Sequence, residues 1–208
     1  KMYEAISGLS FKTRWVNVTF VEEGKTRREH AFFIEHKSTL EKRLGLVSAE
    51  VEKISLTELE PLAATTAALF QYVIANADYS LTTALVGECC HNAKLLVSAD
   101  GRYLPLLYDF DSSGLVNAKY ALPPDNLGIK RVTSRVYQGY CRNNEYLTAA
   151  RSTLLAAEEQ LFKIIKDDDL LSPKSIKRMT RFLADAFKVL GDDAKFTSSI
   201  VEKCRGSR

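Results

Sequence analysis

Leu106-Leu107-Tyr108-Asp109-Phe110-Asp111-Ser112-Ser113-Gly114 decides how this chain is interpreted, because an apolar strand ends here in two carboxylates one residue apart. In an extended chain alternate side chains point to the same side, so Asp109 and Asp111 could share one hard cation such as Mg²⁺. The same pattern also fits a strand that runs into an Asp/Ser/Gly turn. Other parts of the sequence are therefore needed to distinguish a metal site from a turn.

The composition of the 208 residues, 46% hydrophobic and 26% charged, is that of an ordinary soluble globular protein. No stretch approaches the roughly 20 apolar residues of a membrane helix, so no membrane span is expected. The net charge of +3 is small, and the densest basic run, Lys25-Thr26-Arg27-Arg28, lies beside Gly24 where a hairpin would turn. We therefore expect no nucleic-acid partner. The composition does not specify an oligomeric state.

The four cysteines are Cys89, Cys90, Cys141 and Cys204. They lack the paired C-x₂₋₄-C spacing that lets one loop clamp a zinc ion. A disulfide from Cys89 or Cys90 to Cys141 is one interpretation, and reduced buried thiols are the other. The compartment, cytoplasmic or exported, depends on which interpretation holds.

Two hairpins are predicted. Residues 15–21 alternate and are rich in β-branched and aromatic side chains, and residues 31–35 follow after a charged loop, with Trp15 expected in the core of this hairpin. Residues 93–98 and 103–108 flank a turn at Asp100-Gly101, and they lead into the two carboxylates. The opening stretch therefore lies at the end of the second hairpin.

Helices are predicted around and after these hairpins. The stretch that begins at Pro61 is apolar nearly all round, which is typical of a helix buried within a domain. Ser172 and Pro173 are a good start for a later helix, and Gly191 is a good end. The expected helices cover residues 2–9, 38–44 with a Ser or Thr cap, 61–75, 145–166 and 172–190.

Three elements follow one another in a fixed order: a buried helix that ends in Asn76-Ala77-Asp78, a hairpin entered through His91-Asn92, and Asp109-Phe110-Asp111 after it. This order resembles the catalytic lobe of protein kinases, in which a catalytic-loop Asp, a metal-binding Asn and an Asp-Phe-Gly-like Asp follow a buried helix. Phosphoryl transfer needs oxygen ligands that hold Mg²⁺ against phosphates and one carboxylate that receives a hydroxyl proton.

The first half narrows the resemblance to atypical kinase-like proteins of the spore-coat-H type. In that family a strand pair ends in a Glu at the hinge, and a helix with a basic residue follows. Related uncharacterised bacterial proteins also look similar. The matching segments are Arg14-x-Val16-x-Val18, Phe33-Ile34-Glu35-His36-Lys37, Leu40, Arg43-Leu44-Gly45, Cys90-His91-Asn92, Tyr108 to Gly114 and Tyr137-Gln138-Gly139-Tyr140-Cys141.

The resemblance implies an α+β, kinase-like fold: residues 1–36 would be the remnant of an N-lobe with its hinge, and residues 37–208 a mainly helical catalytic lobe with a short hairpin. It implies binding of Mg²⁺ and ATP, and transfer of phosphate to a protein or small-molecule substrate. Asp78 would be the catalytic Asp and Asp111 would assist the metal. Asn92 and Asp109 would bind the metal, and the backbone of Ile34, Glu35 and His36 would meet the adenine.

The chain departs from that pattern in two ways. Asp78 and Asn92 are 14 positions apart, whereas typical kinases use five, so residues 79–90 would be an insertion that loops out and returns, held by a Cys90–Cys141 bridge. A glycine-rich phosphate loop and a strand Lys are also missing from the sequence. They would lie upstream of Lys1, or the protein would be a catalytically inactive, kinase-like interaction domain.

A rival enzyme class starts from the same residues. An apolar strand that runs into Asp-x-Asp is close to the haloacid-dehalogenase-type phosphatase motif, with Asp109 as the nucleophile and Asp111 as the acid/base. Asp192 and Asp193 would be its later carboxylates, and its Lys would be Lys163, Lys166 or Lys174. That fold needs further parallel strands alternating with helices, and only helices are expected after Tyr140.

Overall fold

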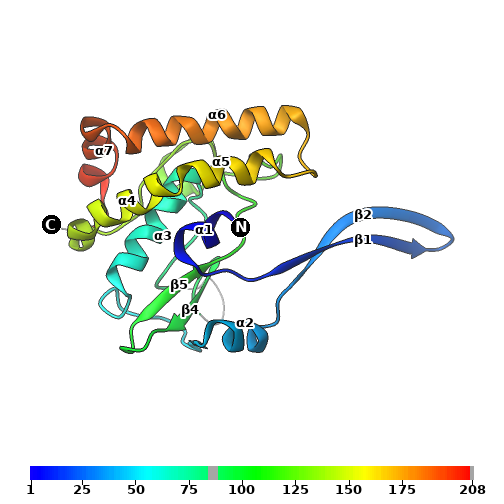
Figure 1. The fold of residues 1–208 in the computed structure, drawn as a ribbon, viewed down its shortest axis with the longest axis horizontal. Helices are drawn as coiled ribbons and strands as arrows, with labels where there is room; N and C mark the ends of the chain where they lie inside the picture. Colours follow the sequence, from blue (N-terminus) through cyan, green and yellow to red (C-terminus); the bar gives the residue numbers. More distant parts are fainter. Residues whose placement is uncertain (84–88, 207–208) are drawn as a thin grey trace.

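The structure, a computed structural model, describes residues 1–83 and 89–206 and has an α+β fold. Helices gather on one side of the body and a small sheet lies on the other, while a long hairpin projects away from both (Figure 1). The predicted α+β class is confirmed at this level. None of the helices in the described ranges is both long and apolar enough to cross a membrane.

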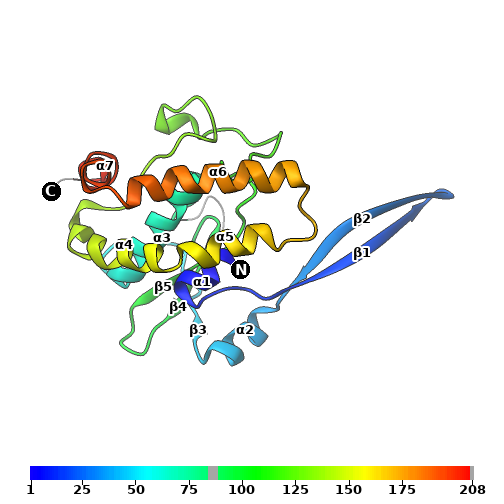
Figure 2. The same ribbon diagram turned by 45° about the horizontal axis from the view of Figure 1, so that its top comes forward.

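The projecting hairpin consists of β1 (Thr13–Glu22) and β2 (Lys25–Ile34), paired antiparallel. Its two-residue turn, Glu23-Gly24, has both φ angles positive, which matches the twist of the flanking strands. The hairpin was predicted, but both strands are longer than the expected 15–21 and 31–35, and the basic run 25–28 belongs to β2 and not to the turn. The placement of Trp15 in a core is also wrong. Its side chain is 50% exposed and meets Phe32 edge-on, because the hairpin extends beyond the rest of the chain (Figure 2).

The main core surrounds α3 (Pro61–Ile74), whose residues are buried without a break from Ala64 onward. Glu60 caps its first turn by accepting hydrogen bonds from two backbone N–H groups. The first helix, α1 (Met2–Ser7), packs against α3 through Tyr3, whose hydroxyl donates to the Pro105 carbonyl at 2.7 Å. The predicted buried helix is therefore the centre of the fold.

The second sheet has the antiparallel strand order β3-β4-β5, formed by β3 (Val47–Ser48), β4 (Ala93–Val97) and β5 (Tyr103–Leu107). Gly101 has a positive φ in the turn between β4 and β5, as the sequence predicts. The helix α2 (Lys37–Leu44) covers this sheet with the buried Leu40. His36 caps α2, not the predicted Ser or Thr.

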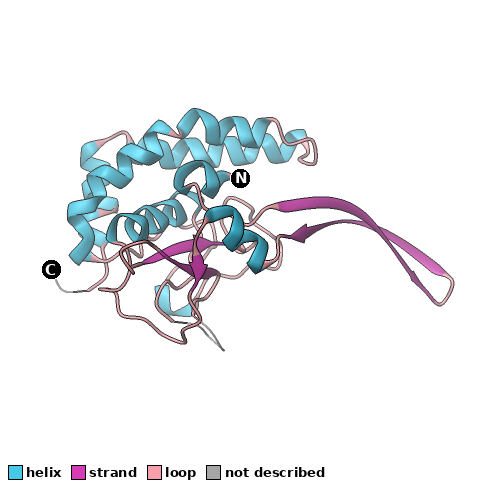
Figure 3. Cartoon of the chain, turned by 60° about the horizontal axis from the view of Figure 1, so that its bottom comes forward, coloured by secondary structure: helices cyan, strands magenta, loops and turns pink. Residues whose placement is uncertain are grey.

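Helices are the main elements of the body (Figure 3), and from Cys141 onward the chain is mainly helical. This part comprises α4 (Leu147–Ala156), α5 (Glu158–Lys166), α6 (Pro173–Leu190) and α7 (Asp193–Ser199), with short 3₁₀ turns at Cys141–Tyr146 and Val201–Lys203. Another 3₁₀ turn lies at Asp125–Leu127. Ser172 caps α6 as predicted. The single helix expected over 145–166 is wrong: it starts later and is interrupted at Ala157, which has no glycine or proline beside it to signal a break.

The cysteines pair differently from the prediction. Cys141 is bonded to Cys204, and Cys89 to its neighbour Cys90, so no bridge joins either of the adjacent cysteines to Cys141. The reason is that the backbone of Arg205 bonds to Gly139 and Cys141, which places Cys204 beside Cys141. Disulfides are typical of oxidising compartments. The choice between a cytoplasmic and an exported protein stays a prediction.

Candidate active site

The first part of the site is the loop that follows α3. Ala75 ends the helix with a left-handed backbone, and Asn76 turns away from it. The Asn76 side-chain oxygen accepts a hydrogen bond from the Asp78 backbone N–H at 3.0 Å, an Asx turn that fixes the direction in which Asp78 leaves the loop. The sequence therefore delivers Asp78 from the end of a rigid, buried helix.

Asp78 is hydrogen-bonded to both His91 and Asn92. His91 Nε2 donates to Asp78 Oδ1 at 2.6 Å. The Asn92 amide donates to the Asp78 backbone oxygen at 2.7 Å and to Oδ2 at 3.2 Å. Both carboxylate oxygens are thus engaged, yet the Asp78 side chain keeps 38% of its surface exposed. The structure therefore brings Asn92 back to Asp78 across 14 positions of sequence.

Backbone bonds hold this return. Ser80 N–H donates to the His91 carbonyl at 3.0 Å, and His91 N–H donates to the Thr83 carbonyl at 3.1 Å. The two ends of the predicted insertion therefore meet at His91. Residues 84–88 of that insertion lie outside the described residues. The predicted Cys90–Cys141 bridge plays no part, because Cys141 is bonded elsewhere.

The register of the second hairpin places Asn92 close to Asp109. Ala93 is paired with Leu107, so the next pair outward is Asn92 and Tyr108, and the Tyr108 N–H donates to the Asn92 carbonyl at 3.1 Å. Asp109 follows directly. Asn92 and Asp109 therefore come from neighbouring strand ends on the same edge of the sheet.

Backbone contacts tie the carboxylate loop to the end of α3. Gly114 N–H donates to the Ala75 carbonyl at 2.9 Å, and Leu115 N–H donates to the Ile74 carbonyl at 3.0 Å. A Cβ on Gly114 would lie 2.7 Å from the Val132 carbonyl oxygen, so this approach requires glycine. Ring contact of Phe110 with a phenylalanine of α3 supports the same arrangement. The loops that carry Asp78 and Asp109 are therefore held by one helix end.

The carboxylates of Asp109 and Asp111 interact electrostatically. Burial raises the pKa of Asp109, and the negative charges of Asp111 and Asp78 raise it further. The pKa of Asp111 is lowered, chiefly because the Tyr120 hydroxyl donates to Asp111 Oδ2 at 2.9 Å. Within the described residues Asp109 forms no salt bridge. The loop therefore gathers negative charge that a cation would neutralise.

Positive φ angles in residues other than glycine cluster at this place. Five such residues occur in the described chain, and three of them are Ala75, Asn92 and Asp109. Left-handed backbone in such residues is uncommon, and it costs free energy that the surrounding structure must supply. Asn and Asp tolerate it best. Ala75 lies where the loop that carries Asp78 begins, and Asn92 and Asp109 lie at two adjoining strand ends.

The predicted hinge residues lie at the base of the projecting hairpin. Ile34 ends β2 with a side chain that is 58% exposed, and His36 caps α2. Glu35 is held by Arg43, with Nε and one terminal nitrogen bonded to its carboxylate at 3.0 and 2.7 Å, and by the Lys12 N–H at 3.0 Å. These bonds lower the pKa of Glu35, with the Arg43 bond first.

The base of that hairpin contacts the strand that precedes the carboxylates. Glu35 N–H donates to the Lys12 carbonyl at 2.8 Å, and the adjacent Phe11 meets Tyr108 edge-on with ring centres 6.0 Å apart. Tyr108 is the residue before Asp109. The hinge segment and the carboxylate loop therefore belong to the same region of the molecule.

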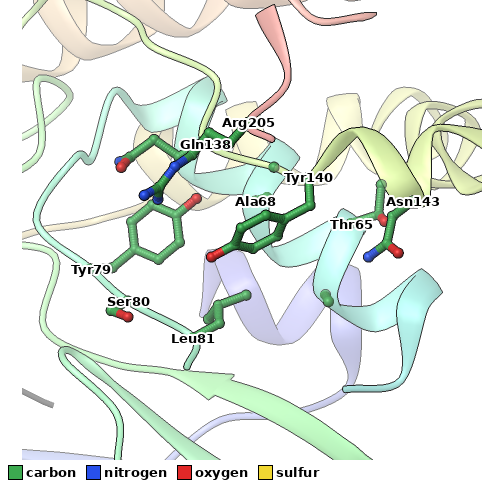
Figure 4. A pocket seen from close by; sticks show the side chains of 11 residues that line it. Thr65, Ala68, Tyr79, Ser80, Leu81, Gln138, Tyr140, Asn143 and Arg205 are labelled. Carbon is green, nitrogen blue, oxygen red and sulfur yellow. The ribbon is translucent and has the colours of Figure 1, made fainter. Parts of the chain in front are cut away.

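A small pocket is lined by the residues that directly follow Asp78. It is lined by Tyr79, Leu81, Gln138, Tyr140 and Arg205 among others (Figure 4). The Tyr79 hydroxyl is buried and has no hydrogen-bond partner in the described chain, and burial raises the pKa of this phenol. None of the predicted catalytic or metal-binding residues lines this pocket. The pocket lies beside the loop that carries Asp78, and no carboxylate of the described residues lines it.

The fit to a metal can be tested on the donors. No group of three or more His, Cys, Asp or Glu side chains in residues 1–83 and 89–206 is arranged to hold a metal ion. Mg²⁺, however, is usually bound through one or two carboxylates and the substrate phosphates, and it keeps several waters. Asn92 uses its amide N–H group toward Asp78, so its side-chain oxygen is not part of these two hydrogen bonds. The Asn92 oxygen and the Asp109 carboxylate are donors of the chemical type that Mg²⁺ binds.

Two participants were not identified from the sequence. His91 bonds to Asp78, and the only sequence signal was its position directly before Asn92. Tyr120 bonds to Asp111 from nine residues away, and no motif marks it.

The later carboxylates of the phosphatase alternative have other partners. Asp192 caps α7 by accepting from the Lys195 N–H, and Asp193 pairs with Arg151 at 2.7 Å. The strand before Asp109 belongs to an antiparallel sheet, whereas the phosphatase fold needs parallel strands.

Comparison with known proteins gives no counterpart. No family model matches the chain, and neither a curated protein nor a solved structure matches it.

Proposed function

We propose that this chain is a kinase-like phosphotransferase that binds Mg-ATP between the hinge and the carboxylate loop. The proposal is carried by the hydrogen bonds between Asp78 and Asn92, which lie 14 positions apart in the sequence. Asn92 lies at the same end of the β4–β5 hairpin as Asp109. A turn residue would need no such partner. Two carboxylates and an amide from three separate segments are the donor types that phosphoryl transfer uses.

Each residue has a role in the proposal. Asn92 and Asp109 hold Mg²⁺, which neutralises charge on the transferred phosphoryl group when bound. Asp78 receives the proton of the substrate hydroxyl, and its partly exposed side chain is accessible to a substrate. His91 and Asn92 fix the orientation of that carboxylate. Asp111, held by Tyr120, assists the metal or its waters.

The adenine side of the proposal uses the backbone of Ile34, Glu35 and His36. The Glu35 side chain is occupied by Arg43, so it fixes the position of the segment and leaves recognition to backbone groups. The Phe11–Tyr108 contact supports this assignment, because it connects the hinge segment to the carboxylate strand. The substrate is a protein or a small molecule with a hydroxyl group.

Isothermal titration calorimetry with Mg-ATP tests the proposal. We expect saturable binding that Asp109→Asn weakens about tenfold or more, because the metal loses a charged ligand. Asp169→Asn is the matched control: it removes one carboxylate from the exposed turn between α5 and α6 and should leave binding unchanged. Absence of Mg-ATP binding by the folded protein with its natural N-terminus would reject the proposal and favour the alternative of a catalytically inactive interaction domain.

A further inference from the structure

The hairpin β1–β2 exposes several large apolar side chains to water. Val21 is 72% exposed, and Phe33 and Ile34 are 67% and 58% exposed. Its strands pair only with each other within the described chain. A two-stranded hairpin is at best marginally stable in water and needs a further strand or a packing partner. Among the described residues, no third strand lies beside this hairpin.

The two free edges of this hairpin differ in charge. β2 carries Lys25, Arg27, Arg28 and Glu29, and charged side chains on an edge strand oppose pairing with another strand. β1 has no charged residue from Trp15 to Val21, and all seven residues of that run are strand formers or small polar residues. The edge that is open to another strand is therefore that of β1.

The sequence of β1 is complementary to itself when two copies run antiparallel. With Val18 opposite the Val18 of a second copy, Val16 lies opposite Phe20, Trp15 opposite Val21, and Arg14 opposite Glu22. Each pair outside the centre occurs twice by symmetry. A slip of one residue in one direction would oppose Arg14 to Val21 and Glu22 to Thr13. A slip in the other direction would oppose Glu22 to Trp15 and Arg14 to Glu23 of the turn. Pairing about Val18 is therefore the register that matches Arg14 with Glu22 inside the strands.

We propose that two copies of this chain dimerise by pairing their β1 strands about Val18. The product is a four-stranded antiparallel sheet with the order β2-β1-β1-β2, in which the charged β2 strands form both outer edges. Those edges stop further strand addition, so assembly ends at the dimer. Three or more strands with an apolar face are enough for a stable sheet, which supplies the neighbour that the hairpin lacks.

Light scattering coupled to gel filtration, together with sedimentation equilibrium, tests the dimer. We expect twice the chain mass of 23.3 kDa at high protein concentration. Val18→Lys places two ammonium groups opposite each other on the axis, and the dissociation constant should rise by about tenfold or more. Thr26→Lys, on β2 and away from the pairing edge, should leave the dimer unchanged.

Charge reversal tests the register itself. Arg14→Glu places acidic side chains opposite each other twice and should weaken the dimer about tenfold, and adding Glu22→Arg should restore it. Hydrogen exchange of the β1–β2 amides verifies that the hairpin still forms in each variant. A protein that stays monomeric at all concentrations would overturn the proposal. Slow exchange of the β1 amides would not rescue it, because pairing with β2 alone also protects amides. A dimer indifferent to Val18→Lys and to the charge reversal would overturn it too.

Discussion

The molecule contains two β-hairpins with opposite relations to the rest of the chain. β1 and β2 have ten residues each, contain many β-branched and aromatic residues, and are mostly exposed. β4 and β5 have five residues each, one of them Pro105, yet they are mostly buried. The short hairpin carries the candidate metal ligands at its end, and the long one carries none. Burial, and not strand length or propensity, decides which hairpin can fix a site.

The difference has a functional consequence under the proposed kinase-like reading. A site on buried strands keeps its geometry, because the packed core restrains both strand ends. A projecting hairpin can accept another strand without disturbing that site. If both proposals hold, the chain separates a rigid region for chemistry from an exposed region for assembly.

The largest contrast is expected from truncation of core and surface side chains. Leu106→Ala in β5 removes a fully buried side chain and should lower the free energy of unfolding by about 2–5 kcal/mol. At protein concentrations where the chain is monomeric, Val21→Ala in β1 should change it by less than about 0.5 kcal/mol, because this side chain is then in water. Urea denaturation followed by circular dichroism measures both. Equal losses would contradict the contrast between the hairpins.

A second effect is expected where the carboxylate loop meets α3. Gly114→Ala places a Cβ within 3 Å of backbone atoms at Val132 and Thr133, so the loop must move. We expect a loss of about 1–3 kcal/mol in stability and weaker Mg-ATP binding. Gly128→Ala is a control with open space around the added methyl group, although its positive φ carries a backbone cost of its own. Binding unchanged in Gly114→Ala would show that the tether does not position Asp109.

A smaller, pH-dependent effect is expected at the base of the long hairpin. Arg43 lowers the pKa of Glu35, so this pair contributes stability above the unfolded-state pKa of about 4.3 and loses it as the pH falls through the lower folded-state pKa. Glu35→Gln should cost about 1 kcal/mol at neutral pH and flatten the acid limb of the stability curve. Thermal unfolding between pH 7 and the acid range measures this, and an unchanged acid limb would exclude the pair as an anchor.

The sequence predicted both hairpins because strand alternation and the turn residues Gly24 and Gly101 are local signals. It predicted α3 and α6 for the same reason, from an all-apolar run and from a cap at Ser172. It could not say which hairpin the core covers, since alternation marks a face without naming what lies against it. Trp15 was misplaced on that account.

The residues of the candidate site were named from the sequence, and they stay a prediction; how they are held together could not be named from it. The order of Asp78, Asn92 and Asp109 is visible in the sequence, whereas the bonds at His91 depend on a chain reversal that no local pattern encodes. The cysteine pairing failed for a similar reason: connectivity depends on which segments meet, and four cysteines allow three pairings. Residues that act through long-range contacts therefore had to come from the structure.

Paramagnetic relaxation by Mn²⁺ in the presence of ATP tests whether Asp78, Asn92 and Asp109 surround one metal and nucleotide site. Mn²⁺ replaces Mg²⁺ at oxygen ligands and broadens the NMR signals of nearby amides. We expect the amide signals of Asp78, Asn92 and Asp109 to broaden together at low Mn²⁺, and Asp109→Asn to abolish the effect. Broadening confined to other carboxylates, such as Asp192 and Asp193, or none at Asp78 when Asp109 responds, would contradict a shared metal and nucleotide site.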